Sequence, residues 1–156
     1  MRILYVGPLW YGCTCRQRME AMKDLGHEVV PVDTEPEEVR NRQKRLFQRV
    51  RRKLLGPPDL AGVNQRICQL IKEGSFDVLW LDKGLTITPE TFRVVRQISP
   101  KTVIVGYSPD DMAARHNQSR VFLKALPLYH IYFTTKSYGV KELEALRVQR
   151  ADFIGN

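Results

Sequence analysis

The sequence lacks the features that mark several large classes of protein. No apolar run approaches the ~20 residues that a membrane span needs. The apolar run that follows Met1-Arg2, Ile3–Val6, is too short for a secretory signal. Only three cysteines are present, two of them in Cys13-Thr14-Cys15, and their spacing matches neither a disulfide framework nor a zinc site. We therefore expect a cytoplasmic protein whose cysteines are small packing residues.

Internal repeats and low-complexity segments are also absent, and the composition is ordinary for a globular chain. Hydrophobic residues make up 43% and charged residues 27% of the 156 positions, which is too apolar for a disordered protein. The length is typical of one domain with one core. We expect a single domain that spans residues 1–156.

The positive charge is concentrated in one part of the chain. The formal net charge is +8, from 25 basic and 17 acidic residues. Eight of the basic residues lie between Arg40 and Lys53, where no acidic residue occurs, and the other 17 equal the acidic residues in number. Because the excess is local, it does not indicate a nucleic-acid-binding coat spread over the surface.

Short apolar runs alternate with segments of helical periodicity along the whole chain. The expected strands are 3–6, 29–32, 76–81, 102–107, 131–133 and 151–154. This alternation predicts the α/β class: a Rossmann-like three-layer sandwich, with a parallel sheet of about six strands covered by helices on both faces. The expected strand order is the Rossmann order 3-2-1-4-5-6.

A basic insertion at about residues 35–58 interrupts this pattern. Apolar residues at helical spacing form one stripe and arginines cover the rest, which predicts a cationic amphipathic helix. The stripe is Val39, Leu46, Phe47, Val50 and Leu54, and the cations placed for contact are Arg45, Arg49, Arg51 and Arg52. Such a helix packs on its own domain through the stripe, or lies on an anionic membrane surface. Nucleic acid is the less favoured partner because no aromatic residues are interleaved with the charges.

The predicted order places strands 1 and 4 side by side, and ligands of open α/β sheets bind outside the carboxyl ends at such a switch point. The loop after strand 1 carries Gly7, Trp10, Tyr11 and Gly12. It does not form the GxGxxG motif, so a dinucleotide grip and an oxidoreductase function are disfavoured. The aromatic pair is a stacking surface for a ring such as a sugar or a base, or else it caps the end of the sheet.

Two arginines, Arg16 and Arg18, open the helix that follows this loop, where cations oppose the helix dipole. Their placement points to an anionic ligand, with Arg16 as the binding residue. The alternative is an ion pair with Glu20 or Asp24.

The loop after strand 4 reads Tyr107-Ser108-Pro109-Asp110-Asp111 and is followed by Asn117. Adjacent carboxylates can supply a general base, because each raises the pKa of the other. Two oxygen ligands from one loop are too few for a metal ion, and an aspartate after proline also commonly caps a turn. We predict Asp110 and Asp111 as candidate catalytic groups and Lys83, Ser108 and Asn117 as substrate-binding residues. We expect no metal and no cofactor.

Several segments resemble the GT-B glycosyltransferases. Met1–Arg18 and Leu25-Gly26-His27-Glu28-Val29 resemble the start of many such enzymes. Asp77–Gly84, Tyr107–Asp111 and Tyr129–Lys136 narrow the resemblance to the spore-maturation, CgeB-like family.

The resemblance implies one half of a GT-B fold, the N-terminal, acceptor-side domain of an enzyme that transfers a sugar from a nucleotide-sugar donor to an acceptor of unknown identity. The donor would be held mainly by a C-terminal domain that this sequence does not contain, so the chain alone would be inactive. Asp110 or Asp111 would contact the acceptor or act in catalysis without a metal, and the Gly7–Gly12 loop would approach the donor phosphates or the acceptor. The basic helix would suit peripheral contact with the inner face of the membrane. The alternative function is a non-catalytic Rossmann-like module that docks on an anionic membrane or another polyanion through residues 40–54.

Overall fold

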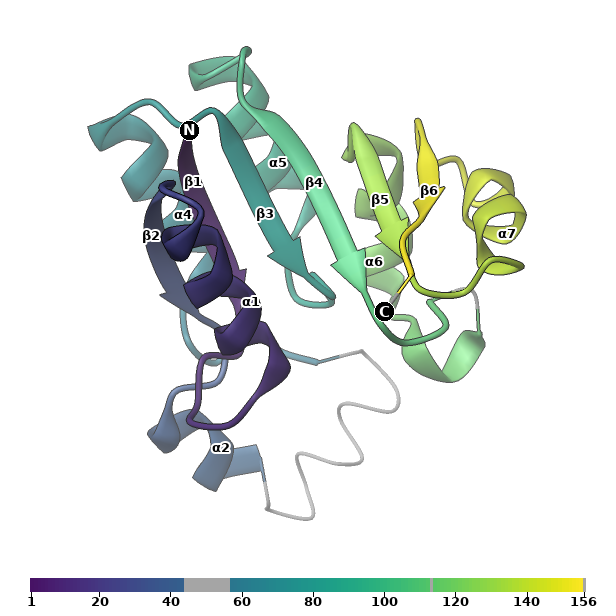
Figure 1. Ribbon diagram of the computed structural model, residues 1–156, viewed down its shortest axis with the longest axis horizontal. Helices are drawn as coiled ribbons and strands as arrows, with labels where there is room; N and C mark the ends of the chain where they lie inside the picture. Colours follow the sequence, from purple (N-terminus) through teal and green to yellow (C-terminus); the bar gives the residue numbers. More distant parts are fainter. Residues whose placement is uncertain (44–56, 113, 156) are drawn as a thin grey trace.

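Six parallel strands form one sheet in the computed structural model, which describes residues 1–43, 57–112 and 114–155 (Figure 1). In chain order the strands are β1 (Arg2–Gly7), β2 (Glu28–Asp33), β3 (Val78–Asp82), β4 (Val103–Ser108), β5 (Ile131–Thr134) and β6 (Ala151–Phe153). Their order across the sheet is β2-β1-β3-β4-β5-β6. The predicted α/β class with six parallel strands is confirmed.

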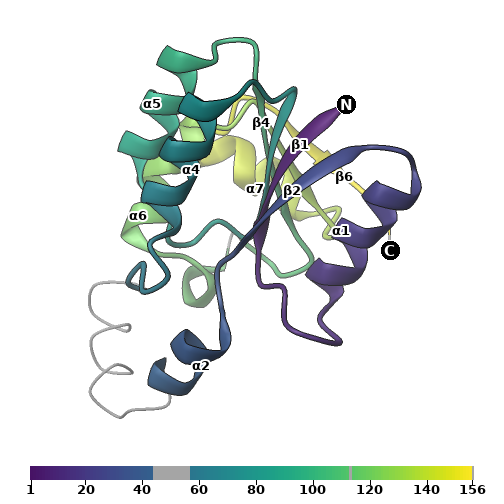
Figure 2. The same ribbon diagram turned by 90° about the vertical axis from the view of Figure 1, so that its left-hand side faces the viewer.

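Helices lie on both faces of the sheet, as Figure 2 shows from the side. The helix α1 (Thr14–Asp24) covers β1 on one face, where Met19 packs against Ile3 and Tyr5. The opposite face carries α4 (Val63–Glu73), α5 (Pro89–Ile98) and α6 (Arg120–Ala125), and the larger hydrophobic core lies beneath them. The remaining elements are α2 (Glu37–Gln43), α7 (Gly139–Ala145) and the 3-10 turns Arg115–Asn117 and Leu126–Leu128.

The order of the strands differs from the predicted 3-2-1-4-5-6 order. After β2 the chain passes through α4 and returns as β3 on the other side of β1, so β2 is left at the edge of the sheet. The switch point therefore lies between β1 and β3, and β3 separates β1 from β4.

Pro31 gives a physical reason for this difference. The amides of Glu28 and Thr34 donate to carbonyl oxygens on the β1 side, from Met1 and Gly7. Since amides alternate in direction along a strand, the nitrogen of Pro31 faces away from β1. A proline nitrogen has no hydrogen to donate to a further strand, so β2 suits an edge position and not a central one.

The start of α5 carries a common capping pattern, Thr88-Pro89-Glu90, whereas the start of α1 does not. The Thr88 hydroxyl accepts a hydrogen bond from the Thr91 amide at 3.3 Å, and Pro89 occupies the first turn of α5. At α1 the capping atom is the Cys13 thiol, which accepts from the Arg16 amide at 3.4 Å. Thiols are weak acceptors, and sequence rules for caps do not anticipate them.

The insertion is only partly described. Its first part forms α2, which lies beyond the carboxyl ends of the strands (Figures 1 and 2). None of the helices in the described ranges is both long and apolar enough to cross a membrane. The predicted contact residues Arg45, Arg49, Arg51 and Arg52 lie outside the described residues.

Candidate functional site

A cavity of about 490 Å³ opens at the carboxyl edge of the sheet, next to the switch point between β1 and β3. Its walls come from the loop after β1, the start of α1, the segments that follow β2 and precede α4, and the loops after β3 and β4. Apolar lining residues include Pro8, Val39, Pro58, Leu60 and Leu85. In size and in apolar character, this cavity resembles the pockets that take small organic molecules.

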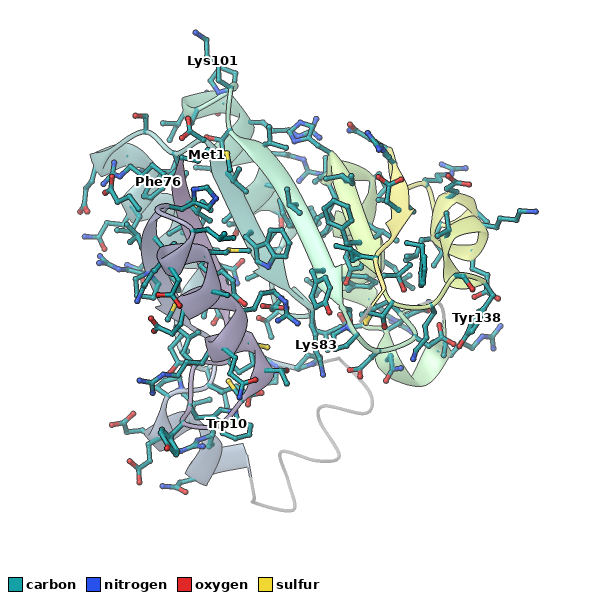
Figure 3. The ribbon with its side chains drawn as sticks, in the orientation of Figure 1. Met1, Trp10, Phe76, Lys83, Lys101 and Tyr138 are labelled. Atoms are coloured by element: carbon teal, nitrogen blue, oxygen red, sulfur yellow. The ribbon has the colours of Figure 1, made fainter. Side chains whose placement is uncertain are left out.

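The loop after β1 contributes an aromatic wall. Trp10 lines the cavity and is 39% exposed, whereas its neighbour Tyr11 is 90% exposed and lies outside it. The Arg40 guanidinium of α2 lies 5.7 Å from the centre of the Trp10 ring, a cation–π contact that connects the loop to α2. Figure 3 shows Trp10 beside α2. The sequence-predicted aromatic pair is therefore divided, because only Trp10 faces the cavity.

Asp82 ends β3 at the floor of the cavity, and its side chain is fully buried. The Arg18 guanidinium of α1 donates to both carboxylate oxygens, at 3.2 and 3.3 Å. The Tyr5 hydroxyl contacts the same carboxylate and the Cys15 carbonyl oxygen, the latter at 2.7 Å. Burial raises the pKa of Asp82, while the contacts with Tyr5 and Arg18 oppose that rise.

Arg18 also packs its guanidinium 3.9 Å from the centre of the Tyr107 ring on β4. Burial by itself lowers the pKa of Arg18, but the Asp82 carboxylate together with the Tyr5 and Tyr107 side chains outweighs it, and the net shift is upward. The partner of Arg18 is therefore Asp82, and not the Glu20 or Asp24 considered from the sequence.

A second ion pair lies at the rim. The Lys83 ammonium lies 2.5 Å from a carboxylate oxygen of Asp110, so the pair connects the loops after β3 and β4. The two side chains are 40% and 43% exposed. Lys83 has a φ of 64° and Gly84 a φ of 66°, so two successive residues adopt the left-handed conformation. Figure 3 shows Lys83 at the carboxyl ends of the strands.

The structure brings together some of the sequence-predicted residues and leaves others apart. Trp10, Gly12, Lys83 and Asp110 line the cavity. Gly7 lies below it, where an added Cβ would be 3.0 Å from the Cβ of Asp82. Arg16 and Tyr11 lie along a separate shallow groove on α1.

The remaining predicted residues organise the loop after β4. The Ser108 hydroxyl is buried and accepts from the Asp110 amide at 3.1 Å. The Asp111 carboxylate accepts from the Ala114 amide at 3.2 Å, and the Asn117 side chain donates to the Asp111 carbonyl oxygen at 2.8 Å. Asp111 thus caps a turn, which is the alternative that the sequence left open. A catalytic role for Asp110 or Asp111 stays a prediction.

Asp82, Tyr5 and Tyr107 were not among the residues selected from the sequence. One feature of the sequence does indicate Asp82, because it is an aspartate at the end of an apolar strand, Val78–Asp82. A carboxylate buried in that position needs polar partners. Identifying those partners requires knowing that β3 pairs with both β1 and β4.

Within the described residues, no three histidine, cysteine or acidic side chains are grouped closely enough to hold a metal ion. Cys13, Cys15 and Cys68 are free thiols. Burial raises the pKa of the Cys15 thiol to about 12, so it remains protonated at neutral pH and is a poor nucleophile.

Comparison with known proteins gives few relatives. No family model matches the chain, and no curated protein matches it. A two-component response regulator of the LuxR family from Aurantimonas sp. SI85-9A1 is similar in structure, with 18% identity, a TM-score of 0.49, and coverage of 97% of this chain and 88% of that one. A putative pilus assembly-related protein from Burkholderia pseudomallei K96243 has 14% identity, a TM-score of 0.37, and coverage of 97% and 92%.

These findings contradict the resemblance to CgeB-like GT-B glycosyltransferases, because neither similar structure is a glycosyltransferase and no family model matches. The predicted role as an acceptor-side domain in sugar transfer is therefore wrong. The motifs have a local explanation: Gly26, with a φ of 82°, ends α1 just before β2 begins at Glu28. Many strand–helix–strand units need the same arrangement. The alternative function, docking on a polyanion through residues 40–54, gains no support from the comparisons.

Proposed function

We propose that this chain is a small-molecule-binding domain whose cavity takes a neutral, hydroxylated ring compound of the size of a sugar or a nucleoside. The observation that carries the proposal is the pairing, in one cavity of about 490 Å³, of an aromatic and apolar wall with the Lys83–Asp110 ion pair. Pockets for such ligands combine apolar surface with a small number of fixed polar groups.

The apolar wall suits the face of a ring. Trp10 offers a flat surface at the mouth of the cavity, and Val39, Leu60 and Leu85 continue the apolar lining inside it. Aromatic side chains contribute large contact areas and lose little rotational freedom on binding. A ligand ring would be covered on one face by Trp10.

The polar pair suits hydroxyl groups. The Asp110 carboxylate accepts hydrogen bonds and the Lys83 ammonium donates them, so together they match a pair of neighbouring hydroxyls. The two charges offset one another, and the Arg18–Asp82 pair below them is also balanced. Glu35 and Asp59 also line the cavity, so its described lining carries more acidic than basic residues and disfavours a free anion such as inorganic phosphate.

The proposal is tested by two-dimensional NMR of the uniformly labelled chain, titrated in turn with neutral monosaccharides, nucleosides and inorganic phosphate. We expect the amide resonances of Gly12, Thr14 and Gly84 to shift with at least one neutral hydroxylated ring compound and to be unaffected by phosphate. Trp10→Ala should weaken that binding about tenfold. Tyr11→Ala is the matched control and should leave the affinity unchanged.

Two results would overturn the proposal. One is a panel in which only phosphate or no compound shifts the cavity resonances. The other is equal loss of affinity in Trp10→Ala and Tyr11→Ala, which would place the ligand outside the cavity.

A further inference from the structure

The Asp82 carboxylate at the end of β3 is held by side chains from two other elements. Its side chain is fully buried, with Tyr5 of β1 and Arg18 of α1 as its partners. Gly7 leaves the space for it, since a Cβ there would approach the Cβ of Asp82 to 3.0 Å. Burying an ion pair is expensive in free energy, so this arrangement needs a reason.

Arg18 connects α1 with the ends of β3 and β4. From α1 it donates to Asp82 at the end of β3 and packs on the Tyr107 ring of β4, 3.9 Å from its centre. The same guanidinium lies 3.4 Å from the Thr14 carbonyl oxygen in the first turn of α1. One side chain thus relates the start of α1 to the ends of two strands.

Lys83 follows Asp82 directly, and its backbone conformation needs support from its surroundings. Its φ of 64° is rarely adopted by residues other than glycine, asparagine and aspartate. The Lys83 amide donates to the Tyr107 carbonyl oxygen at 2.8 Å, and the Gly84 amide donates to the Asp82 carbonyl oxygen at 2.8 Å. Strained backbone of this kind persists only where its surroundings fix it.

The geometry points to Arg18 and Asp82 as positioning residues: their buried ion pair fixes the end of β3, and through it aims the Lys83 ammonium at Asp110 in the cavity. This inference rests on the proposed function, in which the Lys83 side chain contacts the ligand and the buried Arg18–Asp82 pair controls its position. Its first test needs no ligand.

Removal of either partner would leave an uncompensated buried charge, which draws in water or shifts the end of the strand. Either change moves Lys83 relative to Asp110 and weakens their ion pair. The Lys83 nitrogen, no longer held against the Asp110 carboxylate, becomes more accessible to an electrophile.

The experiment measures how fast each lysine of the full chain reacts with a limiting amount of an amine-acylating reagent, by mass spectrometry. Lys101, exposed at the opposite end of the sheet, is the internal reference (Figure 3). We expect Lys83 to react about two- to fivefold faster, relative to Lys101, in Asp82→Asn and Arg18→Gln, the range that an exposed ion pair supports. Asp110→Asn removes the direct partner and should give the same increase.

Two further variants separate positioning from general loss of stability. The double variant Arg18→Gln with Asp82→Asn restores a neutral hydrogen-bonding pair and should recover part of the protection of Lys83. Ile104→Val destabilises the core at the distant start of β4 and should leave the ratio of Lys83 to Lys101 unchanged. Arg18→Lys, the mildest change, keeps the experiment interpretable if other variants fold poorly.

The outcomes distinguish this inference from the proposed function. Unchanged Lys83 reactivity in Asp82→Asn and Arg18→Gln, with the expected rise in Asp110→Asn, would overturn the positioning role and leave the ligand proposal standing. An equal rise in Ile104→Val would overturn it as well. If reactivity changes as expected but no ring compound binds, the positioning role holds and the proposed ligand is wrong.

Discussion

At the scale of single residues, His130 shows how one ring nitrogen makes stability depend on pH. Its Nδ1 atom accepts a hydrogen bond from the Ile104 amide at 2.8 Å, just before β5 begins, so that nitrogen carries no proton in the folded state. Burial, followed by the nearby Arg96, lowers the pKa of His130 in the folded state. The unfolded chain therefore takes up the proton first as the pH falls.

The direction in which stability changes with pH follows from this order of protonation. The stabilisation is fully present above the unfolded pKa of about 6.5 and is lost as the pH falls from there to the lower folded pKa. We expect the midpoint of urea unfolding to decrease between pH 7.5 and pH 5.5 more in the wild type than in His130→Asn, whose side-chain oxygen can accept from the Ile104 amide without titrating. Equal pH dependence in the two proteins would show that His130 is not the responsible group.

At the scale of the elements, the centre of the sheet is packed closely enough for one methyl group to matter. Gly106 lies in β4, and a Cβ there would overlap the Tyr132 ring and lie 2.9 Å from Cε1 of Tyr129. Both rings are fully buried. We expect Gly106→Ala to lower the free energy of unfolding by about 1–3 kcal/mol, as overpacking does, measured by urea denaturation.

Gly26→Ala is the comparison for that substitution. A Cβ at Gly26 meets nothing within 4 Å, so its expected effect, about 1–2 kcal/mol, comes from the φ of 82° alone. The two variants differ in a second respect, since only Gly106→Ala should perturb the near-ultraviolet signal of the buried tyrosines. A Gly106→Ala protein as stable as the wild type would contradict the packing argument.

The elements themselves follow closely from the sequence, because their signals are local. The Thr88-Pro89-Glu90 start of α5 and the apolar runs of the six strands are readable without knowledge of any distant contact. The cap of α1 by Cys13 is not, since a thiol in that role has no distinctive pattern. The Lys83–Asp110 pair is an intermediate case: both residues were selected, but their contact depends on which strands are neighbours.

At the scale of the whole molecule, the order of the strands could not be predicted from the sequence, because contacts between distant segments determine it. Whether β3 or β4 lies next to β1 decides which loops form the cavity. The network of Asp82, Arg18 and Tyr5 could not be predicted from the sequence for the same reason, since its members come from elements that only the tertiary fold brings together. Pro31 was the one residue in β2 that carried information about this choice.

The edge position of β2 makes a direct prediction for hydrogen exchange. The amides of Glu28 and Thr34 donate toward β1, so those of Val30 and Val32 lie on the same side and are protected, while those of Val29 and Asp33 face away. We expect Val29 and Asp33 to exchange about 100-fold faster or more than Val30 and Val32 under native conditions, because local opening is not needed to expose them. NMR-detected exchange of the four amides provides the measurement. In the 3-2-1 order, another strand would cover the outer side of β2 and all four amides would be protected alike, so uniform protection would contradict the sheet order and, with it, the placement of the cavity beside β1 and β3.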